Sequence, residues 1–236
     1  MTYRGLIHFH SRFSYDSNTS IESIVNFALK KKLNFLILTD HDTIKGSQNL
    51  KEYVAENNYD IEVLIAAEYC TEYGDVIAIN ISEEVRDMTF KNFVLDVRSQ
   101  GGFILFPHPY VGHKNIEEIA NNSDLIEVFN SRVSDEKNKK SLELANKYSK
   151  KAYFSSDAHN KNSLNNGIVE FKKNGDLVQS LLNSNMILEH PKKTFLYEIY
   201  SSQIVKSLKQ KNINLLLRMG LNSIKAFMLL KLFRRV

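Results

Sequence analysis

The sequence predicts an α/β fold in which short buried strands alternate with amphipathic helices and close into a distorted seven-stranded β/α barrel. Continuous apolar runs such as Phe35–Leu38 and Phe103–Phe106 are typical of strands that are buried on both faces. The segments between these runs repeat apolar residues every three or four positions, as helices do. About seven such units are too many for a small open sheet, which favours a TIM-like barrel.

The predicted elements follow one another closely. The first strand covers 5–7, and Thr19 or Ser20 caps a helix that covers 21–29. Further strands are predicted at 35–38, 63–67, 76–79, 103–106, 125–129 and 152–154, with short ones at 168–171 and 186–188. Further helices are predicted at 47–57, 90–100, 116–120, 135–150 and 176–183.

Composition describes an ordinary soluble chain, with 43% hydrophobic and 25% charged residues. The single cysteine, Cys70, excludes an internal disulfide and fits a reducing cytoplasm. The first residues carry no apolar signal-peptide region, so we expect a cytoplasmic protein.

The chain is predicted to divide near Pro191 into a barrel domain, 1–190, and a basic helical extension, 191–236. The extension holds ten Lys/Arg and one acid, Glu198, whereas the first 190 residues carry a net charge of −5. Its apolar helix, predicted at 213–236, is expected to pack on the barrel, the usual fate of such a helix. An oligomer or partner interface and peripheral contact with an anionic membrane are the alternatives. Nucleic acid is disfavoured there, because the basic residues are not interleaved with stacking aromatics.

Five of the seven histidines fall at predicted strand ends, and carboxylates stand beside them. A barrel would bring these ends together at one mouth. The convergent residues are His8, His10, Asp16, His41, Glu68, His108, Asp157 and His159. So many acids and imidazoles would repel one another or stay unpaired without cations. Eight ligands exceed one tetrahedral site, and mixed His/carboxylate ligands suit zinc, manganese or iron. We therefore expect at least two divalent metal ions.

These residues carry a resemblance to a known family. The segments H-F-H at 8–10, T-D-H-D at 39–42, P-H-P at 107–109 and S-D-A-H at 156–159 resemble, in order, the motifs of the PHP (polymerase and histidinol phosphatase) family. The similarity covers residues 5–175 and is greatest to short, stand-alone members. It implies a PHP-type barrel whose two- or three-metal cluster hydrolyses phosphate esters.

The resemblance also implies how the ligands are shared. One metal would be held by His8, His10, Glu68 and Asp157, with Glu68 bridging to a second near His108. A third metal would be held by Asp16, His41 and His159. Two departures stand out: Glu127 and Asn130 lie where some members have a His or Cys ligand, and Asp75 lies where nucleotide phosphatases of the family often carry a His.

The expected chemistry is attack on phosphorus by a water that two cations have deprotonated. A cation from the chain should bind the phosphate, and Arg132 and Arg12, each just beyond a strand end, are the candidates. His159 is a candidate both as ligand and as catalytic group. Glu127 is expected to form a structural hydrogen bond. Asp40 and Asp42 are expected to orient the His41 ring and to cap the next helix.

The favoured function is a phosphoesterase that acts on a small phosphorylated metabolite or nucleotide, with nucleic acid entering only as a nucleotide or short oligonucleotide. A non-catalytic metal-binding module acting through a partner is one alternative, although the intact ligand set favours an enzyme. Hydrolysis of a carbon–nitrogen bond on the same cluster is the other, and fold alone does not separate it from ester hydrolysis.

Overall fold

The computed structural model describes residues 1–233. Its strands are β1 (Thr2–Ile7), β2 (Phe35–Ile37), β3 (Glu62–Val63), β4 (Ala66–Thr71), β5 (Gly74–Ile79), β6 (Phe103–Phe106), β7 (Leu125–Asn130), β8 (Lys151–Ser155), β9 (Ile168–Lys172) and β10 (Met186–Leu188). Its helices are α1 (Ile21–Lys31), α2 (Lys45–Glu56), α3 (Phe90–Ser99), α4 (Ile116–Asn122), α5 (Asp135–Lys147), α6 (Leu177–Asn183), α7 (Leu196–Lys209) and α8 (Ile213–Phe233), with a 3₁₀ turn, η1, at Ser163–Gly167.

The described strands form two mixed five-stranded sheets, in the orders β10-β9-β1-β2-β3 and β4-β5-β6-β7-β8. The α/β class is therefore confirmed, but the strands do not all run parallel to their neighbours, as they would in the predicted β/α barrel. β5 runs antiparallel to both β4 and β6, and β9 runs antiparallel to β1 and β10. The connection between β4 and β5 explains the first reversal: it holds only residues 72–73, too few for a parallel crossover.

A closed seven-stranded barrel is not found in the described residues. The two sheets nevertheless meet at the carboxyl ends of β1 and β2, through parallel bridges that pair Phe9 with Ala158 and His41 with Glu68. A hydrogen bond of 2.8 Å from the His10 amide to the Ala158 carbonyl supports the first bridge. The sheets thus face each other as an incomplete barrel, joined at one end.

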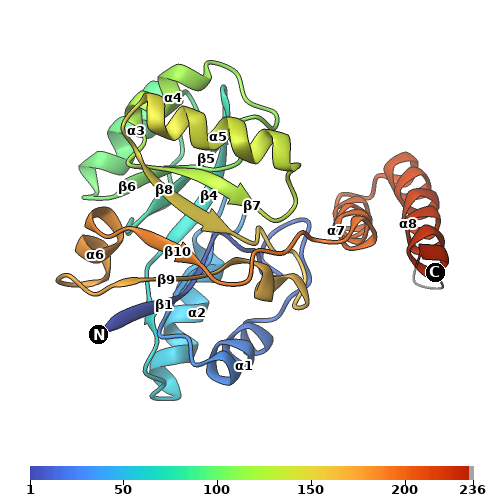
Figure 1. Cartoon of the computed structure of the whole chain (residues 1–236), viewed down its shortest axis with the longest axis horizontal. Coiled ribbons are helices and arrows are strands. Elements are labelled where there is room, and N and C mark those ends of the chain that lie inside the picture. The colour runs from blue at the N-terminus through green and yellow to red at the C-terminus, as the bar shows by residue number, and fades with distance from the viewer. Residues whose placement is uncertain (234–236) are drawn as a thin grey trace.

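The core lies in three apolar clusters. One fills the space between the sheets, and it includes Ile7, Ile37, Ile77 and Tyr153. The second packs α3, α4 and α5 against β4–β7, and the third packs α1 and α2 against β1 and β2. Figure 1 shows the two groups of helices on opposite sides of the molecule.

The predicted strand at 63–67 is divided between the two sheets. β3 ends at Val63 and β4 begins at Ala66, whose amide and carbonyl both bond the Ser47 hydroxyl of α2, at 3.2 and 3.0 Å. Glu68 consequently lies inside β4 rather than at the end of a strand. The other predicted strands and helices of the first 190 residues are present, within a few residues of their predicted bounds.

The extension forms two helices. α7 lies against the end of the sheets where they meet, and α8 turns back alongside α7 on the side away from the sheets (Figure 1). The expectation that α8 packs on the barrel is therefore wrong, and residues 234–236 of the predicted helix lie outside the described residues. Among residues 1–233, no helix has both the length and the apolarity needed to cross a membrane. The domain boundary at 190 stays a prediction.

Candidate metal centre

The backbone turns sharply where three of the predicted ligands leave their strands. His8, His108 and Asp157 have φ angles of 57°, 28° and 47°, in the left-handed region that side chains other than glycine rarely adopt. Each such residue costs on the order of 1 kcal/mol, and such residues concentrate at functional sites. The turns direct these side chains toward the space between the sheets.

Four side chains converge at the centre of the cluster. Glu68 Oε2 lies 3.4 Å from both His8 Nε2 and His10 Nε2, and Asp157 Oδ1 lies 3.6 and 3.3 Å from the same two nitrogens. All four residues are buried. In the described part of the chain, His8 Nε2, His10 Nε2 and Glu68 Oε2 have no hydrogen-bond partner. Buried polar atoms rarely stay unpaired, so three unpaired atoms around one point fit a bound cation.

Glu68 also reaches a second group of ligands. Its Oε1 lies 3.1 Å from His108 Nε2. Asp75, on the adjacent strand β5, has a carboxylate oxygen within 4.8 Å of ligand atoms of both residues. Burial and the nearby Glu68 raise the pKa of Asp75, because a second negative charge is unfavourable there. Asp75 is therefore a further candidate ligand. In the sequence it stands out only because nucleotide phosphatases of the family often carry a His at this place.

The third group forms around the loop after β1. Asp16 Oδ2 lies 3.3 Å from His41 Nε2 and 3.0 Å from His159 Nε2, and His10 completes a set of four with ligand atoms within 4.8 Å of one another. The His41 ring stacks on Tyr15, with ring centres 4.5 Å apart. All eight predicted ligands are therefore brought together.

The carboxylates and imidazoles of the cluster shift one another's protonation. Burial lowers imidazole pKa values, yet Glu68 and its neighbouring carboxylates raise the pKa of His8 and bring that of His41 to about 9. His10 differs: burial and the charges of His159 and His41 lower its pKa to about 3. Protons on His8 and His41 thus offset the carboxylates, and bound cations would displace those protons.

Glu127 supports the cluster from behind. Its Oε1 pairs with His8 Nδ1 at 2.9 Å, and its Oε2 accepts hydrogen bonds from the His108 amide at 2.7 Å and the Asn130 side chain at 3.0 Å. Asn130 also donates to Asp157 Oδ2 at 3.2 Å. Glu127 therefore forms the expected hydrogen bond, and Asn130 links it to a predicted ligand.

Asp40 and Asp42 do not act as expected on the His41 ring or the next helix. Asp40 accepts hydrogen bonds from the amide and hydroxyl of Ser11, both at 2.6 Å, and so joins the loops that follow β1 and β2. Gly46 is needed beside it, because a Cβ there would stand 1.7 Å from an Asp40 oxygen. Asp42 accepts from the Cys70 amide at 3.2 Å, and α2 begins after Ile44 without a side-chain cap.

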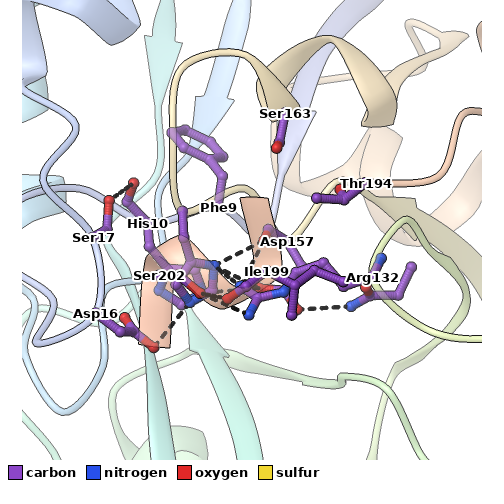
Figure 2. A network of polar contacts seen from close by, with 12 residues as sticks. Phe9, His10, Asp16, Ser17, Arg132, Asp157, Ser163, Thr194, Ile199 and Ser202 are labelled. Atoms are coloured by element: carbon purple, nitrogen blue, oxygen red, sulfur yellow. Dashed lines mark hydrogen bonds and ion pairs between the residues drawn. The ribbon is translucent and has the colours of Figure 1, made fainter. Parts of the chain in front are cut away.

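The two predicted arginines lie in different places. Arg132 contacts His159 Nδ1, lies 3.8 Å from Asp157 Oδ1 and donates to the Ser202 hydroxyl of α7 at 3.1 Å. Figure 2 shows Arg132 and Asp157 beside Ser202 and Ile199. Arg12 is exposed and faces a separate hollow among acidic residues of α1 and α2. The structure thus brings Arg132, and not Arg12, to the cluster.

The cluster lies at the bottom of a cleft of about 450 Å³. Apart from the ligands and Arg132, its walls come from the loops after β1, β6 and β7, from α5 and from α7. They include Tyr15, Val111, Val133, Ser134, Lys137, Ile199, Gln203 and Lys206. The α7 residues Ile199, Gln203 and Lys206 fall in a helical pattern without a chemical motif, so sequence reasoning does not assign them to the site.

Comparison with known proteins agrees with this geometry. Residues 7–190, well over half of the chain, match the family model described as PHP domain. The chain belongs to the PHP domain family. The suspected resemblance is thereby confirmed, and α7 and α8 lie beyond the part that matches the PHP model.

Relatives of this PHP protein cover it only in part. An uncharacterized protein of Methanocaldococcus jannaschii is 28% identical over 115 residues, which make up 44% of this chain and 66% of the relative. The chain spans half to two thirds of the length of the curated relatives it matches.

Solved structures share the fold. A two-domain protein from Bacteroides vulgatus ATCC 8482, containing a predicted PHP-like metal-dependent phosphoesterase, aligns with a TM-score of 0.66 at 18% identity, over 81% of this chain and 65% of that one. A lesion-specific endonuclease from Pyrococcus furiosus aligns with a TM-score of 0.53 at 15% identity, over 80% and 58%. This PHP protein thus shares its fold with these two structures and carries histidine and carboxylate groups that could hold metal.

Proposed function

We propose that the protein is a metal-dependent phosphoesterase that hydrolyses a small phosphorylated metabolite or nucleotide. The observation that carries the proposal is the set of buried, unpaired ligand atoms of His8, His10 and Glu68 at the bottom of the cleft. The cleft volume of about 450 Å³ falls within the range of small-molecule sites.

The distances between ligand atoms favour three groups of ligands. His8, His10, Glu68 and Asp157 would hold one cation, and Glu68 with His108 would hold a second. Asp16, His41 and His159 would hold a third. Two or three ions of zinc, manganese or iron suit these ligands. When bound, such ions lower the pKa of water and offset negative charge on phosphoryl oxygens.

Arg132 is proposed to bind the phosphate. Its guanidinium lines the cleft and is held in place by the Ser202 hydroxyl and by the carbonyl and carboxylate of Asp157. A guanidinium fixed in this way donates two parallel hydrogen bonds to phosphate oxygens without having to reorganise. His159 would act as a ligand through Nε2, while its Nδ1–H donates to the Asp157 carbonyl at 2.9 Å and so fixes the orientation of the ring.

The cleft walls are proposed to select the rest of the substrate. Lys137 and Lys206 add positive charge to the rim, which favours an anionic substrate. Ile199, Val111 and Val133 add apolar surface that displaces water from the reacting group.

The test is phosphate release from a panel of phosphomonoesters and phosphodiesters by protein loaded with manganese, zinc or iron. A panel of amides and cyclic imides runs in parallel. Asp157→Asn should abolish release and lower metal content, whereas the matched Asp135→Asn, whose side chain is 91% exposed, should change neither.

Three outcomes would contradict the proposal. Full activity after exhaustive chelation would exclude metal catalysis. Turnover of amides alone would assign the cluster to carbon–nitrogen hydrolysis. Metal-loaded protein that turns over no member of either panel would favour the non-catalytic module.

A further inference from the structure

Helix α8 carries an exposed apolar face that nothing in residues 1–233 covers. Ile213, Leu217, Leu221, Ile224 and Met228 are between 54% and 70% exposed. Their spacing of three or four residues places them along one side of the helix. We call these five residues the α8 stripe.

The stripe faces away from the rest of the chain. α8 packs against α7, and its half-buried residues Leu215, Leu216 and Met219 lie on the other side of the helix from the stripe. A contiguous apolar surface of this kind on one helix is characteristic of an interaction site.

Positive charge borders the stripe. Arg218 and Lys225 are exposed and lie on the helix next to the stripe, and Lys211 precedes α8. The sequence contains no acid after Glu198. The surface therefore combines apolar side chains with basic ones and has no negative charge of its own.

Charge complementarity distinguishes the possible occupants. A second copy of α8 would bring its own Arg218 and Lys225 close to these residues, with no acid on either helix to offset them. An anionic lipid surface supplies the missing negative charge, and its acyl boundary accepts apolar side chains. We propose that α8 lies flat on anionic lipid bilayers, with the stripe inserted and Arg218 and Lys225 against the headgroups. This inference does not depend on the proposed hydrolase activity.

The experiment is sedimentation of the full-length protein with vesicles of phosphatidylcholine, with and without about 30% phosphatidylglycerol. We expect binding to the anionic vesicles that weakens with salt. Leu221→Glu places a charge in the stripe, and Asn214→Glu places the same charge on its polar border beside Arg218, so the pair separates the cost of inserting the charge from the loss of electrostatic attraction. Leu221→Glu should reduce the partition coefficient about tenfold more than Asn214→Glu does.

A second variant tests the charges. Arg218→Gln combined with Lys225→Gln should weaken binding to anionic vesicles by about twentyfold, since each basic residue contributes about fivefold near such a surface. Circular dichroism checks that every variant keeps its helices.

Three results would overturn the proposal. One is failure of the wild-type protein to sediment with anionic vesicles. Another is an equal effect of Leu221→Glu and Asn214→Glu. The third is a wild-type dimer in size-exclusion chromatography that Leu221→Glu dissociates, which would assign the α8 stripe to a second copy of the chain.

Discussion

Replacing Glu127 with glutamine tests whether one carboxylate holds the metal ligands in position from behind. Glu127 pairs with His8 Nδ1 through one oxygen and accepts from the His108 amide and Asn130 through the other. Glutamine has a single oxygen, so its amide group must face either the His8 ring nitrogen or the two N–H donors. A buried donor is then left without an acceptor, which costs about 1–3 kcal/mol.

The same change affects His8 as a ligand. In the neutral ring that would bind metal, the carboxylate keeps the one proton on Nδ1 and leaves the Nε2 lone pair, which faces Glu68 and Asp157, for the metal. Losing such a hydrogen bond weakens metal binding about 10- to 100-fold. We therefore expect Glu127→Gln to lower metal affinity by that factor, measured by competition with a chromogenic chelator.

A control variant separates the positioning of the metal ligands from the general stability of the protein. Glu62→Gln removes a carboxylate that accepts from the Tyr3 hydroxyl at 2.8 Å, at the amino ends of β1 and β3, and it should leave metal affinity unchanged. The two variants and the wild type are also melted after chelation. A Glu127→Gln protein that melts at a lower temperature but binds metal as the wild type does would refute the reasoning, because Glu127 would then be purely structural.

Three further predictions concern the cleft and its protons. Arg132→Ala should lower kcat/KM about 10²- to 10³-fold without loss of metal. Arg132→Lys should recover only part of the lost kcat/KM, because lysine cannot bind phosphate in a bidentate manner. Unchanged kinetics would exclude Arg132 as the phosphate-binding residue. Lys206→Ala should raise KM several-fold with kcat unchanged, whereas Lys211→Ala, outside the cleft, should alter neither. Metal binding should release protons at pH 7 and strengthen as pH rises toward about 9, because raised pKa values keep His8 and His41 protonated in the metal-free protein. Calorimetry in buffers of different ionisation enthalpy measures the protons released. Identical binding heats in all buffers would contradict the prediction.

The ligand set could be predicted from the sequence because most ligands stand where a buried apolar run ends. That boundary is visible for His8, His41, His108 and Asp157, and parallel strands carry such ends to the same edge. Glu68 was also identified, although it lies inside β4. The direction of each strand is not encoded in its apolar run, so the reversals at β5 and β9 were missed.

The contribution of α7 was missed for a different reason. Ile199, Gln203 and Lys206 lie in an ordinary amphipathic pattern, and only packing shows that they face the cleft. Arg12 shows the converse: its place just after a strand suggested a site residue, yet its side chain turns toward the acidic surface of α1 and α2. The position of a residue along the chain indicates where the backbone leaves a strand. The direction of its side chain, in contrast, depends on neighbours that are distant in sequence.

α7 contacts two parts of the candidate metal centre through its side chains. Lys209 donates to the carbonyls of Arg12, Ser14 and Ser17 at 3.0, 2.7 and 2.6 Å, so its ammonium holds the loop that carries Asp16. Ser202, about two turns earlier on the same helix, accepts from Arg132. Charge-assisted hydrogen bonds of this kind are stronger than neutral ones. α7 therefore fixes two parts of the candidate site, whereas the stripe of α8, the next helix, faces away from the rest of the described chain.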